Sequence, residues 1–408
     1  MVSVCFYFQV HQPFRLDNYT VFDIGKHSKY FNNKKNQEVL RKVATKCYIP
    51  TNNLMLHLIN KYPKFKISYS FSGVLLEQLE QYAPEVIESF KQLVDTGNVE
   101  ILSETYYHSL AFLYSKEEFI EQVMLHKKKV KELFGVEPQV FRNTELIYNN
   151  ALAKCVEELG YKGILAEGAD HVLGWRSPNY IYRPKDSKIS LLLKNYKLSD
   201  DVAFRFSDKG WKEHPLTVEK YAQWINATNG NGNVINLFMD YETFGEHQWA
   251  STGIFNFIKS LPGELLKHPD NNFMTPSEVI KNYNPVAELD IHNVISWADL
   301  ERDTSAWLGN NMQKSAIAKI YEVESKIKES NDPQLLEAWR KLQTSDHFYY
   351  MCTKWFNDGD VHKYFNPYDS PYDAFIAYMN IFNDLQLNLK RGEQSGEEKI
   401  VLQGQLQT

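Results

Sequence analysis

The stretch Val234–His247, VINLFMDYETFGEH, joins a short apolar run to a cluster of polar residues that follows it directly. A brief apolar run with a polar boundary is typical of a buried β-strand. The same order of apolar run and polar cluster recurs along the N-terminal part of the chain. This stretch therefore predicts a fold in which buried strands end in polar loops.

Six further apolar runs alternate with amphipathic stretches before about residue 280. The runs are Val4–Val10, Phe65–Phe71, Val99–Leu102, Val140–Phe141, Gly163–Ala166 and Ser190–Leu193. The intervening stretches carry helix signals: Pro84 can start one helix, and Asn150 can cap another. Regular strand–helix alternation favours a parallel sheet covered by helices, and about seven strands favour closure into a barrel. We expect an α/β fold, with a TIM-barrel-like (β/α) barrel formed by residues 1–280.

The pattern changes beyond about residue 305, where helical spacing replaces the strand-like runs. Leu335, Trp339 and Leu342 mark one apolar helix face, and the stretch from Phe375 to Leu385 carries another. We expect a C-terminal helical domain, residues 281–390, that contributes to the cleft. Residues 391–408 are rich in Gly, Glu and Gln and are predicted to form a flexible tail.

Composition excludes several classes of protein. The 408 residues include 45 Lys+Arg and 51 Asp+Glu, a net charge of −6, which gives no electrostatic reason to expect nucleic acid. No apolar run approaches the roughly 20 residues that cross a bilayer, no signal-peptide pattern opens the chain, and no membrane partner is expected. The four cysteines are far apart, as in reduced thiols, and predict a cytoplasmic protein: Cys5, Cys47, Cys155 and Cys352. The glycine loops of dinucleotide and P-loop sites are absent, and no cofactor is expected.

Two carboxylates stand at the ends of predicted strands, Glu145 and Asp240. In a parallel β/α barrel the strand ends carry the active site, because the βα loops converge there. Two facing carboxylates are what glycoside cleavage requires, one to attack or activate water and the other to protonate the leaving oxygen. The alternative is that each carboxylate is paired with a neighbouring Arg or a helix N-terminus. The residues alone leave both interpretations open.

Three histidines also lie in the polar clusters: His11, His108 and His247. Each could bind a sugar hydroxyl, ligate a metal, or be a core histidine bonded to a backbone carbonyl. The chain lacks His-x-His and His-Glu-x-x-His, so a metal site is not favoured.

Aromatic residues make up 14% of the chain, and Trp249, Trp297 and Trp307 lie inside polar clusters. A sugar platform is one role for such rings, and core packing is the commoner one. Glu242 is expected to support the principal carboxylates through hydrogen bonds.

These clusters, in this order, resemble glycoside hydrolase family 57, specifically its α-amylase-like members. The matching segments run from residue 11 to about residue 310 and are each short. They are His11-Gln12-Pro13; Gly97 to Ile101 with Tyr107-His108; Thr144-Glu145; Asp240 to Gly245; and Trp297-Ala298-Asp299 with Asp303 and Trp307 to Asn310.

The resemblance implies a seven-stranded barrel followed by a helical domain. It also implies retaining chemistry, with Glu145 at the nucleophile position and Asp240 at the acid/base position. His11, His108 and Asp303 fall on positions that line the substrate subsites. Gln12, Arg142, Glu242, His247, Trp249, Trp297 and Trp307 are further candidates for substrate binding.

Arg142 departs from the family pattern, because many members carry a tryptophan three residues before the nucleophile. The loss of that ring could change sugar stacking. Arg142 could instead bind the Glu145 carboxylate and favour its ionised form.

The expected function is hydrolysis of α-1,4-glucosidic bonds in starch-like or glycogen-like glucans or maltooligosaccharides, as in an α-amylase. A 4-α-glucanotransferase or a branching enzyme on the same substrates is the alternative within this class. Outside it stand a metal-dependent deacetylase or mannosidase-like barrel and a non-catalytic glucan-binding protein. The sequence does not predict an oligomeric state.

Overall fold

The computed structural model describes residues 2–354 and 366–405 of the chain. By its internal packing the chain forms two compact units. Unit 1 comprises residues 1–12, 37–106 and 121–298, and unit 2 comprises residues 13–36, 107–120 and 299–408. The expected boundary at residue 280 stays a prediction. The two units are not divided at a single point in the sequence, because the early segments 13–36 and 107–120 pack with the C-terminal helices.

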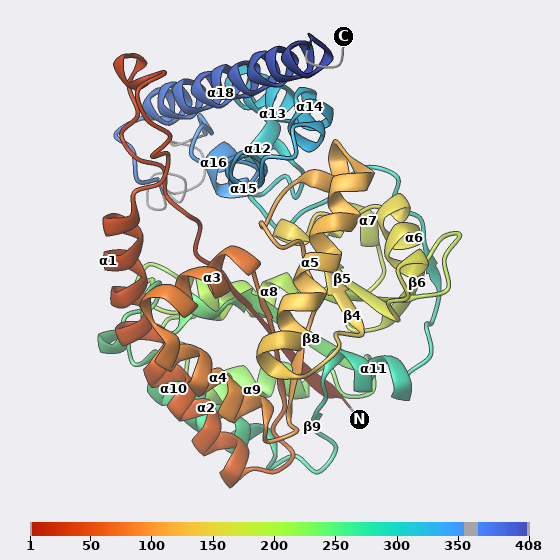
Figure 1. Ribbon diagram of the computed structural model, residues 1–408. Coiled ribbons are helices and arrows are strands. Elements are labelled where there is room, and N and C mark those ends of the chain that lie inside the picture. The colour runs from red at the N-terminus through yellow and green to blue at the C-terminus, as the bar shows by residue number, and fades with distance from the viewer. Residues whose placement is uncertain (1, 355–365, 406–408) are drawn as a thin grey trace. The chain divides into compact units, whose positions relative to one another are not determined.

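Unit 1 is built on seven parallel strands in the order β4-β5-β7-β8-β1-β2-β3 (Figure 1). A parallel bridge between Ser103, just after β3, and Phe141 of β4 closes the ring. The seven predicted strands are thereby confirmed. They are β1 (Ser3–Val10), β2 (Ile67–Phe71), β3 (Val99–Ile101), β4 (Val140–Arg142), β5 (Gly163–Glu167), β7 (Ser190–Lys194) and β8 (Val234–Asp240).

Three further strands lie outside the ring. β6 (Ile181–Pro184) pairs antiparallel with β7, β9 (Asn272–Phe273) pairs with β1, and β10 (Glu288–Leu289) pairs with β6. The sequence did not predict them, because β9 and β10 have only two residues each and the four residues of β6 include Arg183 and Pro184, which interrupt an apolar run.

Side chains of β1 alternate between two cores, as the period of a strand requires. Cys5 and Tyr7 belong to a cluster with Phe238 and Leu192 of neighbouring barrel strands. Val4, Phe6 and Phe8 belong to a second cluster, which includes helix residues. A strand buried on both faces reads as a continuous apolar run, which explains why the strands could be located from the sequence.

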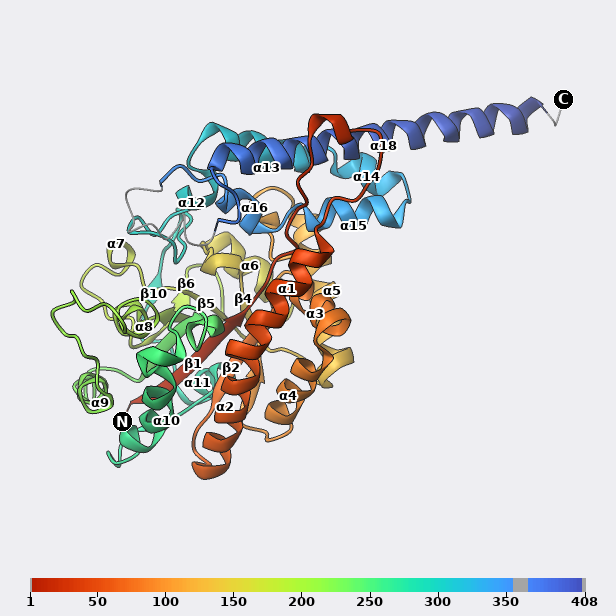
Figure 2. The same ribbon diagram turned by 90° about the vertical axis from the view of Figure 1, so that its left-hand side faces the viewer.

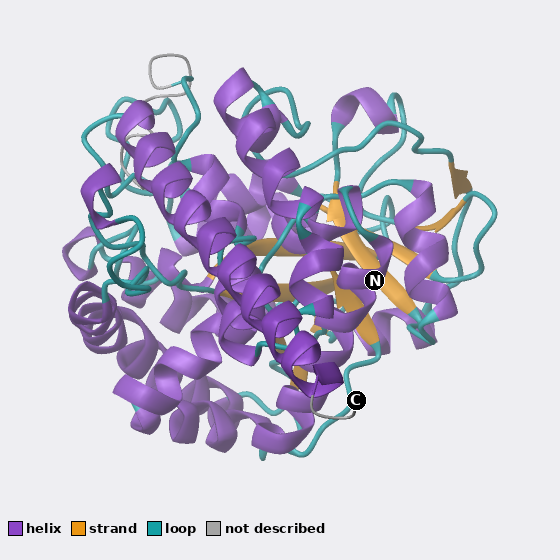
Figure 3. Cartoon of the chain, turned by 45° about the horizontal axis from the view of Figure 1, so that its top comes forward, coloured by secondary structure: helices purple, strands orange, loops and turns teal. Residues whose placement is uncertain are grey.

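Helices surround the strands of unit 1 (Figure 3), and Figure 2 shows α2, α3 and α4 side by side. α4 begins at Pro84 as predicted, whereas the cap of α6 is Asn149, which accepts a hydrogen bond from the Leu152 N–H, and not Asn150. The helices are α1 (Asn33–Val43), α2 (Ile49–Lys61), α3 (Gly73–Tyr82), α4 (Pro84–Val94), α5 (Lys116–Phe134), α6 (Asn150–Glu158), α7 (Asp170–Leu173), α8 (Tyr196–Ala203), α9 (Val218–Asn226), α10 (Ile254–Leu265) and α11 (Pro276–Asn282). Of these, α1 and α5 begin in segments of unit 2.

The described residues of unit 2 after residue 304 are mainly helical, as expected. Its helices are α12 (Ser305–Leu308), α13 (Asn311–Glu322), α14 (Glu324–Glu329), α15 (Pro333–Lys341), α16 (Ser345–Tyr349) and α18 (Pro371–Gln405). α18 contacts α13 and α15, and it extends through most of the segment expected to be a tail; residues 406–408 lie outside the described part. Arg340 of α15 makes a two-bond ion pair with the buried Glu118 at 2.8 and 3.0 Å, which holds the early segment to the helices. No helix among the described residues is long and apolar enough to span a membrane.

Candidate active site at the carboxyl ends of the barrel strands

Each strand of the barrel places a polar side chain at or just after its carboxyl end. We call this set the strand-end ring. Its members are Gln9 of β1, Ser70 of β2, Glu104 after β3, Arg142 of β4, Glu167 of β5, Lys194 of β7 and Asp240 of β8. All except Asp240 are buried. Burying this many polar groups is costly unless they are paired, so their partners define the site.

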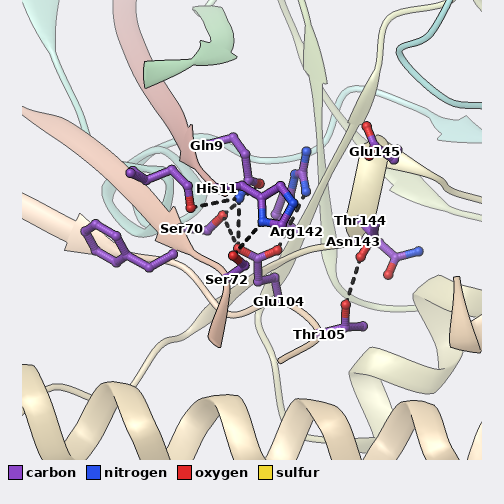
Figure 4. Close-up of polar contacts among 12 residues, drawn as sticks. Gln9, His11, Ser70, Ser72, Glu104, Thr105, Arg142, Asn143, Thr144 and Glu145 are labelled. Carbon is purple, nitrogen blue, oxygen red and sulfur yellow. Dashed lines mark hydrogen bonds and ion pairs between the residues drawn. The ribbon is translucent and has the colours of Figure 1, made fainter. Parts of the chain in front are cut away.

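One half of the ring is a hydrogen-bond network around Glu104 (Figure 4). Gln9 Nε2 and Ser70 Oγ both donate to Glu104 Oε1, at 2.9 and 3.0 Å. Tyr7 donates its hydroxyl to Gln9 Oε1 at 2.8 Å. Burial raises the pKa of Tyr7 well above its ordinary value, so the phenol keeps its proton and remains a donor.

Arg142 lies in the same network and is fully buried. Its Nη1 is 3.8 Å from Glu104 Oε2, and its guanidinium lies over the rings of Trp297 and Tyr7, at 4.9 and 6.0 Å. The three guanidinium nitrogens have no hydrogen-bond partner among the described residues.

The expectation that Arg142 binds the Glu145 carboxylate is therefore wrong, because its ion-pair partner is Glu104. The reason is that the two residues lie in different structural elements. Arg142 is still in β4, whereas Glu145 lies beyond the strand in the turn Thr144–Leu146. Figure 4 shows Glu145 apart from the network around Glu104.

Glu145 has an unusual backbone, with φ +58° and ψ 23°. A residue other than glycine in this left-handed region is uncommon, and such strain is often found at functional sites. Trp297 contacts Glu145 twice: its indole N–H donates to Glu145 Oε2 at 2.9 Å, and its backbone N–H donates to the Glu145 carbonyl at 3.1 Å. The partly buried carboxylate is thus held in a defined position at the end of β4.

Asp240 ends β8 and is aligned with Gln9 of β1 across the barrel sheet. Two residues further along, the buried Glu242 accepts a hydrogen bond from the Tyr48 hydroxyl, and Gln12 is a further hydrogen-bond partner. Burial, and then the neighbouring charge of Asp240, raise the pKa of Glu242 from 4.5 to about 8. Two neighbouring carboxyl groups repel each other when both are charged, so the pair Asp240 and Glu242 holds a proton near neutral pH.

The raised pKa of Glu242 predicts a pH effect on stability. The folded protein binds this proton more tightly than the unfolded chain, so this group lowers the free energy of unfolding as the pH rises from 4.5 to about 8. In Glu242→Gln we expect this component, at most about 1.4 kcal/mol per pH unit, to disappear. Urea denaturation across this pH range measures it. Glu88→Gln, at an exposed site of α4, serves as the control, and an unchanged pH dependence in Glu242→Gln would contradict the prediction.

The other predicted residues of unit 1 occupy varied settings. His11 Nδ1 lies 2.6 Å from Ser72 Oγ. Desolvation of the charged form lowers the pKa of His247 to about 4, so the partly buried ring is neutral at pH 7. Trp249 is 63% exposed and can offer a ring face to a ligand.

Three predicted site residues belong to unit 2: His108, Asp303 and Trp307. His108 is buried, and Asp303 Oδ1 accepts a hydrogen bond from the Ser305 N–H at 2.8 Å. Trp307 is only 1% exposed and lies against Tyr349. Its ring is part of the core of unit 2, which is the commoner of the two roles considered for it, and it presents no face to a sugar as a substrate-binding candidate would.

Several residues of the strand-end ring were missed by sequence reasoning. Lys194 Nζ lies 3.0 Å from Asp200 Oδ1 and 3.7 Å from Glu167 Oε2, and 5.4 Å from the Trp297 ring. The signal for Gln9, Glu167 and Lys194 was present, since each is a polar residue at the end of an apolar run. Within either unit taken by itself, the described residues contain no group of three side chains placed to ligate a metal.

A parallel (β/α) barrel with carboxylates at the ends of β4 and β8 has the architecture of barrel enzymes that act on glycosidic bonds. The model of glycosyl hydrolase family 57 matches residues 5–292. The chain belongs to this family.

The chain is similar to a Methanocaldococcus jannaschii protein named provisionally as an alpha-amylase. The two are 47% identical over 403 residues, which are 95% of this chain and 85% of the relative. This chain is also 24% identical to a 4-alpha-glucanotransferase of Thermococcus litoralis over 241 residues, which are 56% of this chain and 34% of that protein. The alpha-amylase AmyC of Thermotoga maritima superposes with a TM-score of 0.61 at 15% identity, over 97% of this chain and 94% of that structure, which shows a shared fold.

Proposed function

We propose that the protein cleaves α-1,4-glucosidic bonds of starch-like or glycogen-like glucans or maltooligosaccharides with retention of configuration. The observation that carries the proposal is the placement of Glu145, held by two Trp297 donors at the same barrel end as Asp240. A fixed carboxylate at this end suits a nucleophile, because attack requires a defined approach to the anomeric carbon.

The proposed reaction has two steps. In the first, ionised Glu145 attacks the anomeric carbon, the bond to the departing glucan oxygen breaks, and Asp240 gives that oxygen its proton. In the second, Asp240 takes a proton from water, and the water oxygen displaces Glu145 from the sugar. Retention requires the two carboxyl groups to be about 5–5.5 Å apart in the working complex.

Transfer to a second glucan is the alternative within the same mechanism. A sugar hydroxyl then replaces water in the second step, as in a 4-α-glucanotransferase. The family resemblance is compatible with both reactions, since the difference lies in which acceptor reaches the intermediate.

Product analysis with maltoheptaose tests the proposed function. We expect shorter products only, with the α-anomer formed first in the proton NMR spectrum, and turnover unaffected by EDTA. Products both longer and shorter than the substrate would show the transferase. Turnover abolished by EDTA would favour a metal-dependent barrel enzyme, and binding without any product would favour a glucan-binding protein.

A further inference from the structure

Trp297 was predicted to be a candidate sugar platform, and the structure shows that it also makes two hydrogen bonds to Glu145. Its indole N–H donates to Glu145 Oε2 at 2.9 Å, and its backbone N–H donates to the carbonyl of the same residue at 3.1 Å. One tryptophan therefore fixes both the main chain and the carboxylate of Glu145. A residue that only stacked on sugar would need neither bond.

A backbone bridge near these two residues explains why the Trp297 indole lies beside the Glu145 carboxylate. Tyr148 and Ile295 form an antiparallel bridge, with N–H···O distances of 2.9 and 3.0 Å in the two directions. This bridge joins the segment after Glu145 to the segment before Trp297. It holds the two segments in register, so the indole N–H reaches a carboxylate whose own backbone is in the left-handed region.

Two buried cations lie against the Trp297 ring. The guanidinium of Arg142 is 4.9 Å and the ammonium of Lys194 is 5.4 Å from the ring. Each cation is paired with carboxylates: Arg142 with Glu104 of the strand-end ring, and Lys194 with Glu167 of the ring and Asp200 of α8. A cation against an aromatic face is attracted to its π electrons and draws density away from the ring. The ring is thereby held in place, and its N–H becomes a better donor to an anion.

We infer that Trp297 is a positioning residue for the nucleophile, supported by Arg142 and Lys194, and that its main role is not sugar stacking. The inference rests on the proposed role of Glu145. It also gives Arg142 a role. Many family members carry a tryptophan at this position, whereas the charge of Arg142 supports the Trp297 indole that holds Glu145. The consequence is that loss of the indole N–H slows the chemical step more than it weakens substrate binding.

The variant Trp297→Phe tests the inference, because it keeps an aromatic face over the cations and removes the N–H. Hydrolysis of 2-chloro-4-nitrophenyl α-maltotrioside gives kcat and KM separately. We expect kcat to fall about 10- to 100-fold, in keeping with loss of one preorganised donor, and KM to change less than about threefold. The acidic limb of the kcat/KM profile should move to higher pH, since the carboxylate then holds a proton more tightly.

A matched control is Trp339→Phe. The Trp339 indole N–H also makes a buried hydrogen bond, to the Ile320 carbonyl at 2.6 Å in the helices of unit 2. Trp339→Phe should lower the melting temperature and leave kcat and the pH profile unchanged. Should Trp297→Phe fold poorly, replacement of Trp297 by 3-benzothienylalanine, which keeps the shape and lacks the N–H, gives the same comparison.

Two outcomes would overturn the inference: a wild-type kcat and pH profile in Trp297→Phe, or a raised KM with unchanged kcat, which is the result for a sugar platform. Glu145→Gln measured in parallel separates this failure from failure of the proposed function. If Glu145→Gln is inactive while Trp297→Phe resembles the wild type, only the positioning role is rejected. If Glu145→Gln retains turnover, the nucleophile assignment itself fails.

Discussion

Glu145→Gln is expected to lower kcat on maltoheptaose by about 10⁴-fold or more, because it removes the group that forms the covalent intermediate. The fold should be preserved, since the amide oxygen of glutamine can still accept the hydrogen bond that the Trp297 indole donates to Glu145. Product release followed by chromatography measures the rate, and the melting temperature checks the fold.

The control for this substitution is Glu88→Gln, the same chemical change at an exposed position of α4. It should leave kcat unchanged. A Glu145→Gln variant that is folded and retains a rate within about tenfold of the wild type would reject Glu145 as the nucleophile, since a nucleophile is worth far more than that.

Asp240→Asn is expected to have an effect that depends on the leaving group. On maltoheptaose the loss of the proton donor should cost about 10²- to 10⁴-fold in kcat. On α-maltosyl fluoride, whose leaving group needs little protonation, formation of the intermediate should be much less affected. Comparing the two substrates in steady-state assays measures the difference.

Added azide provides a second readout for Asp240→Asn. Azide needs no base to attack the intermediate, so it should accelerate turnover of the fluoride substrate and give an α-configured glycosyl azide. Asp270→Asn, in an exposed loop of unit 1, is the control and should behave as the wild type. Equal losses on both substrates, with no effect of azide, would be incompatible with Asp240 as the acid/base.

The barrel could be predicted from the sequence because its strands are buried on both faces. Val4–Val10 and Val234–Met239 read as continuous apolar runs, and both are strands of the closed ring. The grouping of residues 13–36 with the C-terminal helices could not be read in this way. It depends on contacts between distant segments, such as the hydrogen bond from Gly25 N–H to Asp384, which leave no local pattern.

The candidate site was predictable in its carboxylates and less so in their surroundings. Glu145 and Asp240 stand at strand ends, which is a local signal. The pairing of Arg142 with Glu104 and the bond from Trp297 to Glu145 join residues from different strands and loops, so only the folded chain reveals them. Trp307 lies in a polar segment and is nonetheless buried, because its helix packs against α16.

Trapping of the intermediate tests the central claim most directly. The protein would be incubated with 5-fluoro-α-maltosyl fluoride, whose second fluorine slows release of the sugar from the enzyme, and then digested for peptide mass spectrometry. We predict one covalent maltosyl adduct, attached to the Glu145 side chain and absent from Glu145→Gln. An adduct on another residue would contradict the assignment of Glu145 as the nucleophile. Formation of the β-anomer as the first product of maltoheptaose hydrolysis would contradict a retaining mechanism.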